Sequence, residues 1–288
     1  MSENSMTAEE VAQILNITKN TVYEMVKRGE LNAYRVGKRL RIEEKDIIEY
    51  KEKKKQRPVK QADRPFIICG TDTILDILAR NMETQNPGTR ILRSYKDSYY
   101  ALIDLYNGDA DASATHMWDG DTDTYNTVYA RCLLPGIPVK KILLAKRNVG
   151  FYVKAGNPKN INGWEDFLRE DLKFENREKG SGIRVLIDER LKLMRIDPAS
   201  VSGYDSVSEN NALAASAVAG GSADFSVGGE KSARKVKGVD FVFLQQECYD
   251  LIVRAEDAET PIVQSMLKII ESDEYAEQVS SLYGYERG

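Results

Sequence analysis

The strongest constraint on the fold is the pattern of residues 7–42, in which short amphipathic helices precede a basic hairpin. The stretch TAEEVAQIL begins with Thr7 and Glu10 at the spacing of a capping box, and its apolar residues recur at helical intervals. After a turn, Thr18 is suited to cap a second helix, TKNTVYEMVKRG, which Gly29 ends. The pattern therefore predicts two short helices joined by a tight turn.

The next segment, LNAYRVGKRLRI, predicts a two-stranded hairpin with one basic face, because apolar residues alternate with arginines around Gly37. The first sixty residues hold 14 Lys and Arg against 10 Asp and Glu, whereas the remainder holds 27 against 35. A polyanion would therefore be attracted to the amino-terminal end only. The side chains expected to contact duplex DNA are Thr18, Lys19, Asn20, Thr21, Tyr23, Arg35, Lys38, Arg39 and Arg41.

The string TAEEVAQILNITKNTVYEMVKRGELNAYRVGKRLRI resembles the excisionase and MerR-type winged helix-turn-helix domains. The resemblance implies a DNA-binding domain over residues 1–56, followed by a basic, proline-broken linker at 57–64. An alternative is a small helical protein-interaction domain with a solvated basic face.

From residue 65 the sequence alternates apolar strands with amphipathic helices, which is typical of an α/β domain. Three predicted strands, PFIICG, TRILRSY and ADASATH, are each followed by small polar side chains. Because the carboxyl ends of parallel strands meet at one edge of a sheet, Thr71, Asp72, Ser98 and His116 are candidate ligand-binding residues.

The stretch NREKGSGIR has the composition of an anion-binding loop, and a helical pattern, VLIDERLKLM, follows it at once. Glycines flank its serine, and an arginine lies near each end. A flexible connector is the alternative. The candidate ligand contacts here are Asn176, Arg177, Ser181, Gly182 and Arg184.

Two long apolar segments, VKKILLAKRNVGFYVKAGNP and VDFVFLQQECYDLIVR, predict strands that cross between two lobes, the first segment forming two strands. We expect lobe 1 to comprise about 65–146 and 248–288, and lobe 2 about 147–247. In SVSENNALAASAVAGG, Ser206 or Ser208 is expected to cap a helix whose first turn carries Asn210 and Asn211.

The order of these segments resembles the type 2 periplasmic binding protein fold, and more narrowly its molybdate-binding branch found behind DNA-binding domains. The resemblance covers about residues 65–288 and implies that Thr71, Ser98, Ser181 and Asn211 hold an oxyanion, molybdate or tungstate. Two departures concern the ligand: GTR is commoner than GIR at 182–184, and a histidine is common at Asn210 or Asn211.

Carboxylates near the expected cleft leave a second ligand class open. Asp72, Asp97 and Glu230 are hydrogen-bond acceptors when ionised, and they would favour a ligand with its own donors, such as an organic amine or sugar. Less favoured alternatives are an enzyme on the same fold, although no recognisable catalytic motif is present, and a thiol sensor using Cys69.

The sequence therefore predicts a one-component transcription regulator: a winged helix-turn-helix followed by a two-lobed α/β sensor. With one His and three scattered Cys, neither a zinc site nor a disulfide framework is indicated, and no cofactor is expected beyond the effector. We expect double-stranded DNA and an oxyanion or small-molecule effector as partners, no membrane, and a homodimer or larger assembly. The amino terminus lacks the features of a signal peptide, so we expect a cytoplasmic location.

Overall fold

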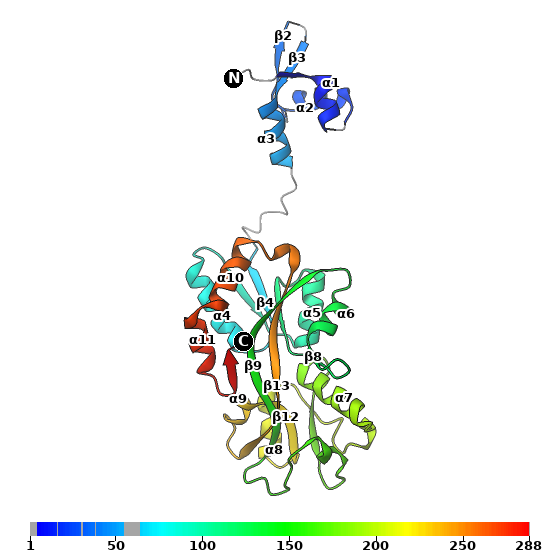
Figure 1. Cartoon of the computed structure of the whole chain (residues 1–288), viewed down its shortest axis with the longest axis vertical. Coiled ribbons are helices and arrows are strands. Elements are labelled where there is room, and N and C mark those ends of the chain that lie inside the picture. The colour runs from blue at the N-terminus through cyan, green and yellow to red at the C-terminus, as the bar shows by residue number, and fades with distance from the viewer. Residues whose placement is uncertain (1–4, 16, 30, 38, 55–63, 288) are drawn as a thin grey trace. The chain divides into compact units, whose positions relative to one another are not determined.

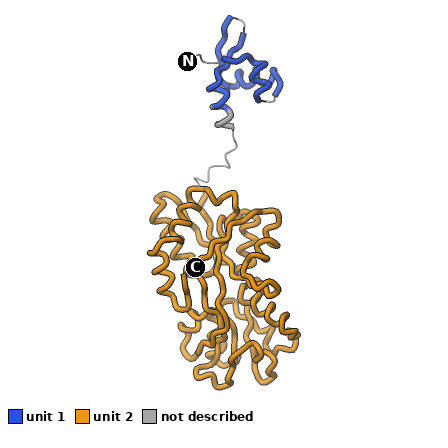
Figure 2. The backbone as a smooth tube through the Cα atoms, viewed as in Figure 1, with its two compact units in different colours: residues 1–63 blue, residues 64–288 orange. Residues whose placement is uncertain are grey.

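The computed structural model describes residues 5–15, 17–29, 31–37, 39–54 and 64–287 (Figure 1). The chain divides into two compact units, residues 1–63 and residues 64–288 (Figure 2). Of the expected linker, only Arg64 is among the described residues. Within the described part of the chain, no helix combines the length and the apolar character needed to cross a bilayer.

The first unit packs helices against a three-stranded antiparallel sheet of order β1-β3-β2. In chain order its elements are β1 (Ser5–Thr7), α1 (Ala8–Leu15), α2 (Lys19–Lys27), β2 (Tyr34–Val36), β3 (Arg39–Glu43) and α3 (Glu44–Lys54). The buried core consists of Ala8, Val11, Ala12, Val22, Met25, Leu31, Ile42 and Ile47. The predicted order of helix, turn, helix, hairpin and helix is confirmed.

Two capping predictions in this unit are confirmed. The Thr7 N–H donates to the Glu10 carboxylate at 2.6 Å, and the Glu10 N–H donates to the Thr7 hydroxyl at 3.3 Å. These reciprocal bonds are a capping box at the start of α1. Thr18 accepts from the Thr21 N–H at 3.2 Å and so caps α2.

The prediction of a hairpin with a single basic face is wrong. The β2–β3 register places Tyr34 opposite Arg41 and Val36 opposite Arg39. Directly paired residues of an antiparallel ladder point to the same face, so these two arginines share their face with exposed Tyr34 and Val36. Arg35 pairs with Leu40 and lies on the opposite face. Only two residues separate the paired Val36 and Arg39 in the sequence, and so short a connection fixes the register.

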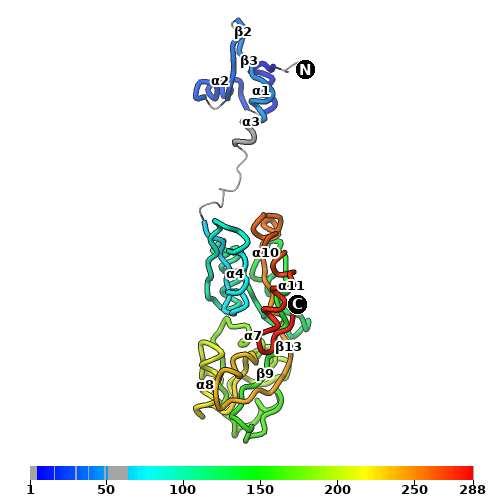
Figure 3. Tube along the Cα trace, turned by 90° about the vertical axis from the view of Figure 1, so that its left-hand side faces the viewer, coloured from blue at the N-terminus to red at the C-terminus, as the bar shows by residue number. Residues whose placement is uncertain are grey.

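The second unit is a two-lobed α/β structure, as predicted. Lobe 1 contains β4 (Phe66–Cys69), α4 (Ile74–Gln85), β5 (Ile91–Ser94), α5 (Ser98–Asn107), β6 (Ala112–Thr115), β7 (Trp118–Asp119), β8 (Thr124–Tyr125), α6 (Thr127–Leu133), η3 (Ala255–Asp257), α10 (Pro261–Glu271), α11 (Asp273–Ser280) and β14 (Tyr285–Arg287). Strand β4 runs parallel to both β5 and β6. The carboxyl-terminal helices α10 and α11 pack on α4, which is the first helix of the same lobe in chain order (Figure 3).

Lobe 2 repeats the parallel arrangement at the other end of the same nine-stranded sheet. Its elements are η1 (Trp164–Leu168), β10 (Phe174–Arg177), α7 (Gly182–Met194), η2 (Pro198–Ser200), β11 (Val207–Ser208), α8 (Asn211–Ala219), β12 (Phe225–Gly229) and α9 (Glu230–Ala233). Strand β10 is parallel to β11 and β12, and β12 is antiparallel to β9.

Two long strands, β9 (Val139–Lys154) and β13 (Val239–Arg254), join the lobes and pair with one another along their length. Along β9, residues 145–147 pair with β14, whereas residues 149–153 pair with β12. The change of partner marks the passage from one lobe to the other. The expectation of two strands in the first of these segments is therefore wrong, because a single continuous strand runs from one lobe to the other.

The lobes have separate hydrophobic cores, and a hairpin links them. Ile68, Leu78 and Tyr249 belong to the core of lobe 1, whereas Phe151 and Phe174 belong to the core of lobe 2. The β7–β8 hairpin leaves lobe 1 after β6, yet Trp118 packs within the core of lobe 2. This hairpin therefore connects the two lobes, in addition to β9 and β13.

Sheet pairing corrects two local expectations. Asn176 and Arg177 end strand β10 and pair with β11, so they do not belong to a loop, and α7 already begins at Gly182. The cap of α8 is Asn210, which accepts from the Leu213 N–H at 2.9 Å. Ser208 lies in β11, where its hydroxyl donates to Glu175, so it is not available as a helix cap.

Candidate functional site

A cleft of about 950 Å³ lies where the parallel strands of both lobes end. Thr71 and His116 follow strands β4 and β6 of lobe 1. Glu178, Glu209 and Glu230 follow strands β10, β11 and β12 of lobe 2. The strand order thus brings residues that are distant in sequence to one crevice, the usual position of ligands in α/β proteins.

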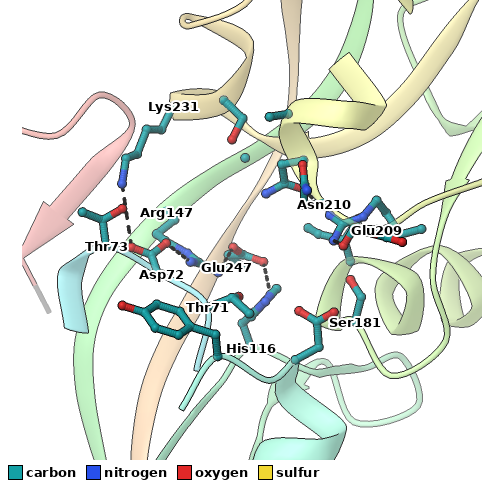
Figure 4. Close-up of a pocket in the computed structure, with 18 of the residues that line it drawn as sticks. Thr71, Asp72, Thr73, His116, Arg147, Ser181, Glu209, Asn210, Lys231 and Glu247 are labelled. Carbon is teal, nitrogen blue, oxygen red and sulfur yellow. Dashed lines mark hydrogen bonds and ion pairs between the residues drawn. The ribbon is translucent and has the colours of Figure 1, made fainter. Parts of the chain in front are cut away.

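Most of the residues predicted to bind a ligand line this cleft (Figure 4). They are Thr71, Asp72, His116, Arg177, Ser181, Asn210, Asn211 and Glu230. Four predicted residues are not part of its lining: Ser98, Asn176, Gly182 and Arg184.

Ser98 and Gly182 support the cleft from behind. The buried Ser98 hydroxyl accepts from the His116 backbone N–H at 3.3 Å. A Cβ atom at Gly182 would lie 2.6 Å from the His116 ring, so only glycine allows the start of α7 to approach this histidine. Both residues therefore position His116.

Asn176 and Arg184 point to other parts of lobe 2. The Asn176 amide donates to the Tyr204 carbonyl at 2.9 Å. Arg184 is one turn into α7, and its guanidinium pairs with Asp188 at 2.9 Å and donates to the Arg177 carbonyl at 3.0 Å. Successive side chains of a helix point in different directions around its axis. Arg184 therefore points away from the cleft, although Ser181, just before the helix, lines it.

A buried ionic cluster forms the floor of the cleft at the crossing strands. Arg147 of β9 pairs with Asp72 and with Glu247 of β13, each at 2.5 Å. Glu247 also bonds His116 Nδ1 at 2.8 Å, and the Tyr285 hydroxyl donates to Asp72. The cluster joins lobe 1, both crossing strands and the carboxyl-terminal β14.

The charges of this cluster hold each other ionised. Burial alone would raise the pKa of Glu247, but Arg147 and then His116 outweigh it, so the pKa is below its ordinary value. The pKa of Asp72 is lowered in the same way, because Arg147 and then Lys231 outweigh the effect of burial. Burial lowers the pKa of Lys231, and the nearby Asp72 only partly opposes it.

Lobe 2 presents hydrogen-bond donors to the cleft. The Asn210 side-chain oxygen accepts from Leu213, and that of Asn211 accepts from Arg177, so both amide NH₂ groups remain for other partners. Ser181 is only 2% exposed, and its hydroxyl has no hydrogen-bond partner within the described chain. Arg177 also donates to the carbonyls of Ser208 and Glu209, which holds the start of α8 against β10.

The same end of the cleft carries carboxylates from both lobes. The Tyr99 N–H of lobe 1 donates to the Gly180 carbonyl of lobe 2 at 3.1 Å, and this contact brings Asp97 close to Glu178. Burial, and then the Asp97 carboxyl, raise the pKa of Glu178.

Comparison with known proteins assigns the second unit to a family. Residues 79–271 match the family model described as "PBP superfamily domain". The chain belongs to the PBP superfamily. Residues 5–55 match a second model, described as "Helix-turn-helix domain", so the DNA-binding motif predicted from the sequence is also found. We refer to residues 64–288 as the PBP domain.

One relative extends over nearly the whole chain. A Bacillus subtilis (strain 168) protein named "Uncharacterized protein YvgK" is 39% identical over 297 residues, covering 98% of this chain and 95% of the relative. A Clostridium pasteurianum protein, "Uncharacterized protein in ferredoxin 2Fe-2S gene 5'region", is 37% identical over 102 residues, covering 35% of this chain and 90% of the relative.

Solved structures show the fold of the PBP domain. A putative phosphate ABC transporter substrate-binding protein from Clostridium perfringens, with bound phosphate, superposes with a TM-score of 0.59 at 14% identity, covering 78% of this chain and 99% of that one. The BenM effector binding domain with benzoate gives a TM-score of 0.54 at 16% identity, covering 74% of this chain and 93% of that one. At these identities the likeness concerns architecture alone.

Two other features of the PBP domain, an acidic group and the Cys69 thiol, are weaker candidates for binding a metal or reacting with a ligand. Asp119, Asp121 and Glu189 are grouped within 4.8 Å, but Lys192 pairs with both Asp121 and Glu189, which neutralises much of their charge. Burial raises the pKa of Cys69, so its reactive thiolate form is disfavoured.

In the helix-turn-helix domain, the predicted contact residues Thr18, Lys19, Asn20, Thr21 and Tyr23 are exposed around the start of α2. The Lys19 ammonium pairs with Glu9, so it would have to leave this partner to contact a DNA phosphate.

On the hairpin, Arg35 and Arg39 are exposed, and neither has an ion-pair partner among the described residues. Arg41 is half-buried and donates to the Ser5 carbonyl at 3.3 Å. Lys38 lies outside the described residues.

The cleft residues that sequence reasoning missed include four in or beside the ionic cluster: Arg147, Lys231, Glu247 and Tyr285. Arg147 and Glu247 lie near the middle of long strands that also carry other charged residues, such as Lys146 and Asp250, so neither was singled out by the sequence. Charged residues are almost never buried without a partner, so their presence at the centre of buried strands indicates an ion pair. Tyr285 carried no comparable signal, since only the pairing of β14 with β9 brings it there.

Proposed function

We propose that this protein is a ligand-responsive DNA-binding transcription regulator. The observation that carries the proposal is the combination, in one chain, of a helix-turn-helix domain with a PBP domain whose cleft is lined from both lobes. We further propose that the first domain is of the excisionase or MerR type and binds double-stranded DNA as a homodimer in the cytoplasm, because a single winged module makes few contacts.

The cleft supports a role in ligand binding rather than catalysis. His116, Glu247 and Asp72 are the groups best suited to proton transfer, yet each is held in the ionic cluster around Arg147. We therefore propose that the protein is not an enzyme and takes no resident cofactor. Ligand can act on DNA affinity only if it binds one arrangement of the lobes better than another.

Two ligand classes are supported by different observations. Neutral donors, namely the Ser181 hydroxyl and the amide groups of Asn210 and Asn211, suit an oxyanion such as molybdate or tungstate. The volume of about 950 Å³ and the carboxylates Asp97 and Glu178 suit an organic ligand with donors of its own.

The DNA-binding part of the proposal is tested with Arg39→Ala and, as a matched control, Arg131→Ala, an exposed arginine of the PBP domain. Binding to duplexes selected from random sequence is measured by fluorescence anisotropy at several salt concentrations. We expect R39A to weaken binding to every duplex and to reduce the salt slope by about one, because one phosphate contact is lost. R131A should bind like the unaltered protein. Equal affinity and slope for R39A would contradict the assignment of the hairpin.

A further inference from the structure

The two ends of the cleft carry opposite charge. We propose that the effector is an organic zwitterion, bound with a protonated nitrogen group at one end of the cleft and with an acidic group at the other. This inference rests on the proposed function, since it defines the ligand class of the same site. Figure 4 shows Lys231 and Glu209 on opposite sides of the pocket, with Asn210 between them in the view.

The acidic end is formed by Asp97, Glu178 and Glu209. None of the three makes an ion pair with a lysine or arginine among the described residues. Arg177 lines the same part of the cleft, and its guanidinium already donates to Asn211 and to two backbone carbonyls. Negative charge therefore exceeds positive charge at this end.

The Ser181 side chain at the acidic end is an independent sign of a ligand. Ser181 is 98% buried, lines the cleft and has no hydrogen-bond partner for its hydroxyl among the described residues. The hydroxyl opens to the cleft, so its hydrogen-bond partner must be water or a ligand that displaces the water. Its backbone N–H donates to the Glu178 carbonyl at 3.3 Å, which places it beside the carboxylates. A protonated amine, amidine or guanidine would donate to both kinds of acceptor.

The opposite end offers cations. The Lys231 ammonium is 3.9 Å from the Asp72 carboxylate, too far for a hydrogen bond, so its donors remain available to a ligand. Lys235 also lines this end and makes no ion pair with a described residue. The Thr71 hydroxyl also lines the cleft and makes no hydrogen bond within the described chain; it lies between Arg147 and His116 in the view of Figure 4. A carboxylate or phosphate fits these groups.

The three carboxylates make a free oxyanion a poorer fit to the whole cleft than a zwitterion, although the neutral donors alone would suit one. A fully ionised tetrahedral dianion has no donors, so it cannot satisfy Asp97, Glu178 or Glu209, and their charge repels it. A zwitterion meets acceptors with donors at one end and cations with an anion at the other.

The experiment compares unaltered protein with E178Q and K231Q, using two controls: E274Q and K268Q remove one exposed charge each on α11 and α10. Thermal shift and isothermal titration are run with three sets of probes. The zwitterions are the common amino acids and phosphoethanolamine, the single-charge probes are cadaverine and glutarate, and the oxyanions are molybdate, tungstate and phosphate.

We expect at least one zwitterion to raise Tm, and both cleft variants to weaken its Kd about tenfold or more, since each removes a charge-assisted bond. E274Q and K268Q should leave that Kd unchanged. If instead only oxyanions bind, and E178Q leaves their affinity equal or higher, the zwitterion assignment is wrong while the proposed function stands. If no probe of any set changes Tm or releases heat, the cleft is not a small-molecule site and both proposals fail.

Discussion

Replacement of Arg147 by methionine tests whether the ionic cluster stabilises the junction of the two lobes. Arg147 is 8% exposed and lies 2.5 Å from both Asp72 and Glu247, which is only 2% exposed. Loss of one partner of a buried pair costs about 3–5 kcal/mol, because an uncompensated charge remains. The stacking of Arg147 on Tyr249, at 4.0 Å, adds about 0.5–2 kcal/mol. Since such terms are not additive, we expect R147M to lose about 4 kcal/mol.

The assay is urea unfolding followed by tryptophan fluorescence at pH 7. Both tryptophans, Trp118 and Trp164, lie in the PBP domain, so the signal reports on that unit alone. The control is the neutral triple variant D72N/R147M/E247Q, which removes the charges together and should fall within about 2 kcal/mol of the unaltered protein. A loss below about 1 kcal/mol for R147M, or an equal loss for the triple variant, would refute the reasoning.

The loss of unfolding free energy in R147M should also depend on pH. In the unaltered protein the pKa values of Asp72 and Glu247 are lowered, so their contribution to stability is present above the ordinary values of 3.8 and 4.5 and is lost as pH falls through the depressed values. In R147M burial would raise both pKa values, and protonation would relieve the unpaired charge. The difference between the two proteins should therefore be smaller at pH 5 than at pH 7.

Three further predictions concern the β7–β8 hairpin, the start of α7 and the acidic end of the cleft. Trp118→Ala should cost about 3–5 kcal/mol by urea unfolding followed by circular dichroism, because this side chain is 3% exposed in the core of lobe 2; Tyr283→Ala, at a 70% exposed position, should change stability by less than about 0.5 kcal/mol, and similar losses would exclude a docked hairpin. Gly182→Ala should cost about 1–3 kcal/mol by the same measurement, since its methyl group would lie 2.6 Å from the His116 ring; unchanged stability would show that the ring moves freely. Glu178→Gln should raise Tm at pH 7.5 and lose this advantage as pH falls toward 4.5, because burial and Asp97 raise the pKa of Glu178 and disfavour its charged form in the folded protein; a Tm difference that is the same at both pH values would contradict this.

The sequence alone was sufficient to predict each structural element that is specified by residues close together in the chain. The capping box of Thr7 and Glu10 and the Thr18 cap appear in the structure as hydrogen bonds, because both depend on neighbours three residues apart. The β–α alternation of the second unit was equally readable. It follows from the period of apolar residues, and it implies that strand ends gather at one edge.

Tertiary structure decided everything that depends on pairing between distant segments. The hairpin register put Tyr34 and Val36 on the face of Arg39 and Arg41, which alternation within each strand could not reveal. Asn176 lies in a strand and not in a loop because it pairs with β11, and Arg184 points away from the cleft, toward Asp188 of α7.

The ionic centre of the cleft shows the same division between sequence and fold. Arg147 and Glu247 are a hundred residues apart, and a charged side chain that becomes buried needs a partner that the sequence does not identify. Only the pairing of β9 with β13, and the return of β14 with Tyr285, identifies those partners. Side-chain types and local spacing are properties of the chain itself, whereas the field that a ligand meets is the sum of charges that folding brings together.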